Sequence, residues 1–121
     1  MDEHAVIVEY ETEEGRADEL RALLTDHARR TLEEEQGCLR FEVLEPIERG
    51  GEAVRNRLMV QETYASALAL SQHEQNPRLE RVRAAMAPLV KSRRLVLARV
   101  IDHRPAEEGI RPENLTAAND D

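Results

Sequence analysis

The chain has little cysteine, few aromatic side chains and no long apolar run, and each shortage excludes a class of protein. Its one cysteine, Cys38, cannot form an internal disulfide, which fits a reducing compartment. No apolar stretch approaches the roughly 20 residues that a membrane-spanning helix needs. The start, MDEHAVIVEY, lacks the basic residues and the small-residue cleavage site of a signal peptide. We therefore expect a cytoplasmic protein with no membrane partner.

Acidic residues outnumber basic ones. The 17 Lys and Arg residues face 25 Asp and Glu residues, so the net charge is -8, and only two Tyr and one Phe supply aromatic rings. Surfaces that bind nucleic acid combine cationic with aromatic side chains, so we expect no nucleic-acid partner. A chain of 121 residues is long enough for one domain with a modest core and too short for two.

Alternating and helical spacings of apolar residues predict seven elements in the order β-α-β-β-α-α-β. Gly15 ends the first strand, Gly37 is a natural residue just beyond the first helix, and Ser66 and Asn76-Pro77 are typical helix starts. The predicted strands cover residues 5–11, 38–45, 57–63 and 94–101. Simple connections and right-handed crossovers make this an α+β protein, a ferredoxin-like plait with a four-stranded antiparallel sheet and helices on one face.

The first strand is apolar on both faces, with Val6, Val8 and Tyr10 on one face and Ala5 and Ile7 on the other. The last strand is apolar on both faces as well, and we expect these two strands to be central neighbours in the sheet. Because the helices can cover only one face, a second copy of the same sheet is the simplest cover for the other. The pattern therefore predicts a homodimer that forms through the sheet faces.

The second and third strands each have one apolar face. Both sets of residues alternate in sequence: Leu39, Phe41 and Val43 in the second strand, and Leu58, Val60 and Glu62 in the third. The second strand has one polar face, which is typical of a sheet edge. Glu62 follows Leu58 and Val60 on the same face of the third strand, so a carboxylate ends an otherwise apolar strand face. Met59 points to the opposite side of the strand.

Three motifs make the chain resemble the antibiotic biosynthesis monooxygenase family, including its quinol-monooxygenase-like members. They lie in EEEQGCLRFEVLE and NRLMVQETYASALALSQHEQNPRL, and the matching residues are Gly37, Cys38, Leu39 and Phe41, then Asn56, Leu58, Val60, Glu62 and Tyr64, then Ala67 and His73. The resemblance covers about residues 5–101. Many family members have Pro-His-aromatic where this chain has Pro77-Arg78-Leu79, so the role of that second histidine is either missing or taken by Arg78.

The resemblance implies a dimeric α+β barrel, in which two sheets pack face to face and each protomer has a pocket between sheet and helices. It also implies chemistry without a cofactor, because the enzymes of this family oxygenate phenolic or hydroquinone-like substrates with neither metal nor flavin. The implied partners are molecular oxygen and a small aromatic or hydrophobic ligand. The chain has no tryptophan, which disfavours the haem-degrading branch of the family.

His73 and Glu62 are the candidate catalytic residues. We interpret His73 as the general base, because an imidazole titrates near neutral pH. Desolvation would raise the pKa of Glu62, and a neighbouring imidazolium would lower it. As a pair with His73, Glu62 would orient the ring and stabilise its charged form. The alternative is a surface or capping histidine and an exposed acid at a strand end.

Seven further residues are candidates for substrate binding: Tyr10, Phe41, Leu58, Val60, Tyr64, Leu70 and Arg78. Core packing is the alternative for the aromatic side chains. Arg78 would bind an anionic group of the substrate, or else lie exposed at its helix start. We find no metal-ligand motif in the sequence.

The sequence therefore predicts a cofactor-independent monooxygenase that acts on a small quinol or polyphenol-type aromatic. The alternative is a dimeric barrel that binds a small hydrophobic ligand, or serves in a stress response, without catalysis. An isomerase or haem-related activity on the same scaffold is disfavoured by the missing tryptophan. We assign residues 1–103 to the domain and residues 104–121 to a polar C-terminal tail, either mobile or laid over a partner.

Overall fold

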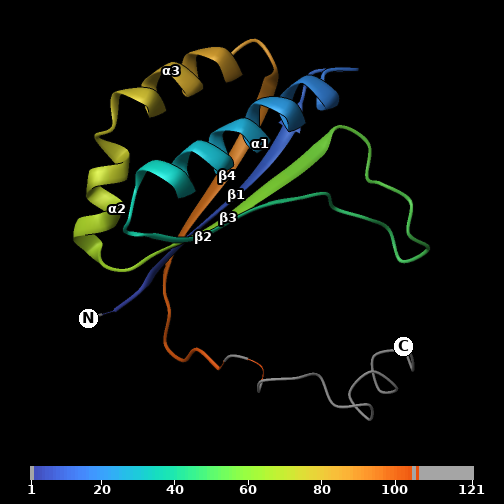
Figure 1. Cartoon of the computed structure of the whole chain (residues 1–121). Coiled ribbons are helices and arrows are strands. Elements are labelled where there is room, and N and C mark those ends of the chain that lie inside the picture. The colour runs from blue at the N-terminus through green and yellow to red at the C-terminus, as the bar shows by residue number, and fades with distance from the viewer. Residues whose placement is uncertain (1, 105, 107–121) are drawn as a thin grey trace.

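The elements follow the predicted order along the chain (Figure 1). The computed structural model describes residues 2–104 and 106, so nearly all of the predicted tail, residues 104–121, lies outside the described residues. The elements are β1 (His4–Thr12), α1 (Ala17–Glu34), β2 (Cys38–Leu44), β3 (Arg57–Tyr64), α2 (Ala67–Glu74), α3 (Pro77–Met86) and β4 (Val90–Arg99). None of the helices within these residues is long and apolar enough to cross a membrane.

The four strands form one antiparallel sheet in the order β2-β3-β1-β4, with the three helices on one face (Figure 1). This is the α+β, ferredoxin-like arrangement that the sequence predicts. The prediction that the first and last strands are both central is wrong. Val8 of β1 lies opposite Val60 of β3 on one side and Leu95 of β4 on the other, so β1 is central and β4 is at the edge.

Strand β2 lies at the other edge, as predicted, but a β-bulge interrupts its alternation. The register against β3 shifts between Cys38 and Arg40, so the residue between them, Leu39, is left 50% exposed. After the bulge the alternation resumes, and Phe41 faces Glu62 across the strand pair. Leu39 therefore does not share the buried face of Phe41, because one extra residue changes the face that the preceding side chains occupy.

Strand β4 begins four residues earlier than predicted. Its pairing with β1 continues to the end of that strand, where Thr12 lies opposite Val90. The residues from Lys91 to Arg94 are too polar for the sequence pattern to predict a strand there. They are exposed at the sheet edge, where a strand needs no apolar side chains on both faces.

The predicted starts of the two short helices are confirmed, whereas the predicted end of α1 is not. The side chain of Ser66 accepts a hydrogen bond from the Ala69 amide, and that of Asn76 accepts one from the Arg78 amide. Helix α1 ends at Glu34, three residues before Gly37. A Cβ atom at Gly37 would lie 2.5 Å from the Cβ of Ala69, so this glycine allows β2 and α2 to approach closely.

Apolar side chains from the inner face of the sheet and from the helices form one core. Its largest fully buried members come from β3, α1 and their neighbours: Tyr64, Leu20, Leu24, Leu58 and Val60. Cys38 belongs to this core, and its burial raises the pKa of the thiol to about 11. Cys38 therefore serves as a small buried apolar residue.

We expect Gly37→Ala to destabilise the fold, because its new methyl group would collide with Ala69 on α2. Overpacking of this kind costs on the order of 1–3 kcal/mol of unfolding free energy, which urea denaturation measures. The matched control makes the same change in an Ala69→Gly background, where most of the loss should disappear. An equal loss in both backgrounds would show that the contact with Ala69 is not the cause.

Candidate functional site

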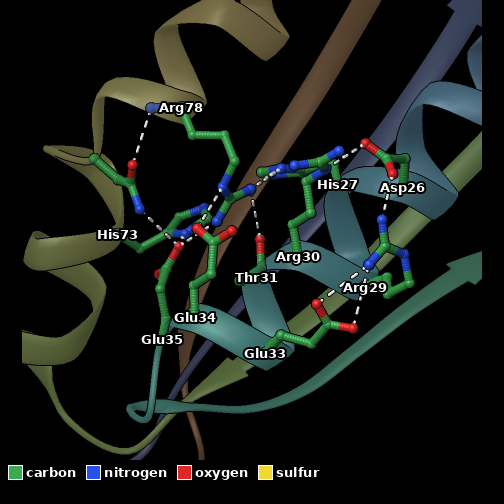
Figure 2. A network of polar contacts seen from close by, with 11 residues as sticks. Asp26, His27, Arg29, Arg30, Thr31, Glu33, Glu34, Glu35, His73 and Arg78 are labelled. Carbon is green, nitrogen blue, oxygen red and sulfur yellow. Dashed lines mark hydrogen bonds and ion pairs between the residues drawn. The ribbon is translucent and has the colours of Figure 1, made fainter.

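Six polar side chains are gathered between α1, the start of α3 and the inner face of the sheet. All are buried or nearly so: His27, Thr31, Glu35, Glu62, His73 and Arg78. They come from four elements and the end of α1, and Figure 2 shows most of them converging beneath α3. Buried polar groups are costly unless they are paired, so their contacts define what this region can do.

Glu62 and Tyr64 lie two residues apart on β3, so their side chains project from the same, inner face. The Tyr64 hydroxyl donates a hydrogen bond to Glu62 Oε1 at 2.6 Å. Burial raises the pKa of Glu62, although the hydrogen bond from Tyr64 and the nearby His73 act in the opposite direction. Burial also raises the pKa of Tyr64, and the Glu62 carboxylate adds to this rise. Tyr64 is therefore a neutral donor.

His73 lies in the last turn of α2, between two carboxylates. Its Nδ1 is 2.8 Å from Glu35 Oε1, whereas its Nε2 is 3.7 Å from Glu62 Oε1. The sequence interpretation in which Glu62 orients His73 is therefore wrong in one respect, because the direct hydrogen bond to the ring comes from Glu35. Glu62 lies close to the other ring nitrogen without a hydrogen bond to it.

Arg78 is buried, with 8% of its surface exposed, and each of its guanidinium nitrogens contacts another side chain. It donates to Glu35 Oε2 at 2.8 Å, to Glu34 Oε1 at 3.2 Å and to Thr31 Oγ1 at 3.2 Å (Figure 2). A further contact joins Arg78 Nη1 to His27 Nδ1 at 2.8 Å. Both expectations for Arg78 are thus corrected: it is neither an exposed helix-start residue nor free to bind a substrate anion.

The sequence interpretation missed His27, whose ring packs edge-on against Phe41 with the centroids 5.3 Å apart. Burial, followed by the positive charge of Arg78, lowers the pKa of His27 to about 4. A signal was present, because position 27 lies three residues after Leu24 and four before Thr31, on the apolar stripe of α1. A histidine on a buried stripe is a candidate for a site.

The sequence interpretation also missed Glu35, the carboxylate that both His73 and Arg78 contact. Asn76 Nδ2 donates to its second oxygen at 3.2 Å, so both oxygens of Glu35 have partners. Its signal is electrostatic. Acidic residues at 33, 34 and 35 end a helix whose C-terminus favours positive charge, and such a run calls for a cationic partner.

A pocket runs between the inner face of the sheet and helices α1, α2 and α3. Six of the predicted site residues line it: Tyr10, Phe41, Val60, Glu62, Leu70 and His73. The other three do not: Tyr64 and Leu58 are core residues, and Arg78 is occupied by its ion pairs. The remaining lining residues were not predicted as site residues: Val6, Val8, Leu24, His27, Glu74, Leu79, Arg83, Met86, Arg93, Leu95 and Leu97.

The walls of the pocket are mainly apolar, and its polar lining residues include His27, Glu62 and His73 as well as Glu74, Arg83 and Arg93. Its volume is about 50 Å³, which is small beside the roughly 300–1,000 Å³ of typical ligand pockets. Burial raises the pKa of Tyr10 to about 12, so this lining hydroxyl is also neutral. The described residues contain no group of three or more His, Cys, Asp or Glu side chains placed to hold a metal ion.

Residues 4–85 match the profile of the antibiotic biosynthesis monooxygenase family. The chain belongs to this family. The match spans both residues of the candidate catalytic pair, Glu62 and His73, and it ends just before the last strand. A comparison with curated protein sequences finds no match.

Solved structures with this fold include proteins described as antibiotic biosynthesis monooxygenases and one described as a cofactor-independent oxygenase. One from Deinococcus radiodurans, described as a putative antibiotic biosynthesis monooxygenase, has a TM-score of 0.71 at 18% identity and covers 85% of this chain and 97% of its own. SnoaB from Streptomyces nogalater, a cofactor-independent oxygenase, has a TM-score of 0.71 at 16% identity and covers 88% of this chain and 100% of its own. At these identities the likeness shows a shared fold.

The geometry suits proton transfer from a bound hydroxyl group. Because a carboxylate can only accept, the hydrogen bond to Glu35 fixes a proton on His73 Nδ1 and leaves the lone pair of the neutral ring on Nε2. That nitrogen faces the Glu62 carboxylate beside apolar walls. An imidazole held in this way can take a proton from a substrate and keep it near a negative charge.

We expect Glu62→Gln to raise the free energy of unfolding at neutral pH. The folded state raises the pKa of Glu62, mainly by burial, so ionised Glu62 opposes folding, and an amide can still accept the Tyr64 hydrogen bond. The advantage should shrink as the pH falls from the raised pKa of the folded state toward about 4.5, the ordinary pKa of this side chain, and should be gone below it, because the wild-type residue is then neutral in both states.

Thermal denaturation of both proteins between pH 3.5 and 8 measures this difference. The matched control is Glu52→Gln, at an exposed turn position, which should change stability little at any pH. A Glu62→Gln variant that is less stable than wild type at pH 7 would contradict the prediction. It would mean that contacts of the ionised carboxylate with Tyr64 and His73 outweigh its desolvation.

Proposed function

We propose that the protein is a cofactor-independent monooxygenase that acts on a small quinol or polyphenol-type aromatic. The observation that carries the proposal is the placement of His73. The chain belongs to a family of monooxygenases, and the His73 ring lines a mainly apolar pocket. Glu35 forms a hydrogen bond with its Nδ1, and Glu62 lies beside its Nε2. In this proposal His73 is the general base and Glu62 stabilises the imidazolium that forms.

The chemistry needs only a substrate that can supply electrons. His73 Nε2 takes the proton of a phenolic hydroxyl, and the resulting phenolate is electron-rich enough to react with molecular oxygen. For a hydroquinone the balance is one hydroquinone and one O2 giving one hydroxyquinone and one water. One oxygen atom forms the new C–O bond, the other leaves as water, and all four electrons come from the substrate.

The pocket supports a small substrate. Its volume of about 50 Å³ leaves no room for a large polycyclic molecule without extensive movement of the surrounding side chains. The long, flexible side chains that line it include Arg93 of β4 and a pair on α3, Arg83 and Met86. Rotation of these two side chains would admit a single aromatic ring, and apolar walls would keep water away from the phenolate.

We also propose that two copies of the chain pack through the outer faces of their sheets. The outer face is the side away from the helices, and its centre combines the directly paired residues Ile7, Gln61 and Val96 with Ala5 and Ala98. Small and apolar side chains at the centre of an uncovered sheet favour contact with another surface. A second copy supplies one of the same size and twist.

We expect Ile7→Arg to disrupt this dimer, because it places a charge at the centre of the outer face. Sedimentation velocity should show a dimer for the wild-type protein and a monomer for the variant. The matched control is Leu68→Arg on α2, where the wild-type side chain is already 67% exposed and away from the sheet. A wild-type protein that sediments as a monomer at micromolar concentration would contradict the proposal.

We expect the metal-free protein to consume oxygen in the presence of a hydroquinone, with a saturable rate above the spontaneous one. With ¹⁸O₂ the product should contain one labelled atom. His73→Ala should lower kcat/KM by about 100-fold or more, the usual loss when a general base is removed. His4→Ala, which changes a histidine outside the pocket, is the matched control and should turn over as the wild type does.

Two results would contradict the proposed function. The first is unchanged turnover of every accepted hydroquinone in both His73→Ala and Glu62→Gln. The second is a saturable thermal shift with hydroquinones and no oxygen uptake, which would favour the alternative of a protein that binds a small aromatic without turning it over.

A further inference from the structure

The two histidines in the pocket have partners of opposite hydrogen-bonding type. His27 Nδ1 lies 2.8 Å from Arg78 Nη1. A guanidinium has only donors, so His27 Nδ1 must be the acceptor and cannot carry a proton. A neutral ring with a bare Nδ1 has its proton on Nε2. Arg78 therefore fixes the tautomer of His27.

His73 has the other tautomer for the same kind of reason. Its Nδ1 lies 2.8 Å from Glu35 Oε1, which can only accept, so Nδ1 carries a proton, and in the neutral ring Nε2 has the lone pair. Arg78 and Glu35 are themselves joined at 2.8 Å. One buried ion pair thus fixes the tautomers of both rings, because Arg78 donates to His27 and Glu35 accepts from His73.

Both rings reach the same pocket, and their centroids are 5.7 Å apart. In the part of the chain that the structure describes, neither Nε2 has a hydrogen-bond partner, since Glu62 stays 3.7 Å from that of His73. Thr12 Oγ1 is the one fully buried polar side-chain atom without a partner among the described residues, so both unpartnered Nε2 atoms are at least partly accessible. The pocket therefore offers one acceptor and one donor at neighbouring points.

We propose that His27 is a substrate-binding residue, whose Nε2–H donates a hydrogen bond to a second oxygen of the substrate while the first donates to His73 Nε2. The ligand is then an aromatic with two nearby oxygens, one a hydroxyl and the other a hydroxyl or carbonyl. The role of His73 as base rests on the proposed function, whereas the binding role of His27 does not. Arg78 is a positioning residue in this arrangement.

A neutral donor suits this task. Burial lowers the pKa of His27 to about 4, so the ring stays uncharged at physiological pH and costs little to keep in an apolar pocket. A fixed N–H group in such surroundings stabilises negative charge that develops on an oxygen atom. Phe41, edge-on against the ring, holds its plane in position.

Two substitutions of His27 separate binding from structure. An asparagine side chain places its amide oxygen near the position of Nδ1, so His27→Asn keeps the acceptor for Arg78 and loses the donor in the pocket. A glutamine side chain reaches the position of Nε2, so His27→Gln keeps the donor and loses the acceptor. The probe is 4-nitrocatechol, a coloured one-ring compound with two adjacent oxygens, and its visible spectrum reports binding.

We expect His27→Asn to bind 4-nitrocatechol about 10-fold more weakly than the wild type, in line with the loss of one hydrogen bond to the ligand. His27→Gln should stay within about 3-fold of the wild type. The reverse order would assign His27 a structural role as the partner of Arg78. Equal binding by both variants, whether unchanged or weakened, would also overturn the proposal.

Nitrogen-15 NMR of the wild-type protein at pH 7 provides an independent test. We expect His27 as the Nε2-protonated neutral ring, and Arg78→Gln should yield a mixture of tautomers. A wild-type His27 protonated on Nδ1, or on both nitrogens, would overturn the proposal whatever the variants do. Neither measurement consumes oxygen, so failure of the monooxygenase assay alone would refute the proposed function and leave this inference standing.

Discussion

The guanidinium of Arg78 meets the carboxylate of Glu35 beneath the start of α3, and the cluster of buried polar side chains is arranged around that contact. Through it, three helices are joined: α1 supplies His27 and Thr31, α2 supplies His73, and α3 supplies the arginine. Replacing a buried ion pair with apolar residues is often neutral for stability, so the pair is weak evidence for a gain in stability. The ion pair instead fixes the direction of the hydrogen bonds around it, because the guanidinium can only donate and the carboxylate can only accept.

The fold was largely readable from the sequence, because it depends on local patterns. Alternation along β3 placed Leu58, Val60 and Glu62 on one buried face, as found, and the caps at Ser66 and Asn76 started α2 and α3 where predicted. The errors arose where pairing between strands overrides the pattern. The bulge at Leu39 and the early start of β4 are set by the neighbouring strand, which a single segment does not reveal.

The site was readable only in part, for a related reason. Glu62 and His73 follow one another closely in the chain, and the structure brings both to one pocket. Glu35 and Arg78 are far apart in sequence, and nothing local to either one indicates their contact. The misplaced charge at the end of α1 and the histidine on its buried stripe were the available signals, and each becomes informative once it is paired with Arg78.

The close approach of Gly37 to Ala69 has a consequence for the geometry around the imidazole. Helix α2 is short, and its distance from the sheet is limited at this point by two small residues. A bulkier residue at either position would act as a spacer and lift the whole helix outward. The histidine at its far end would then move away from the acids at the end of α1 and on β3, so the absence of one methyl group helps to set the spacing between the imidazole and these carboxylates.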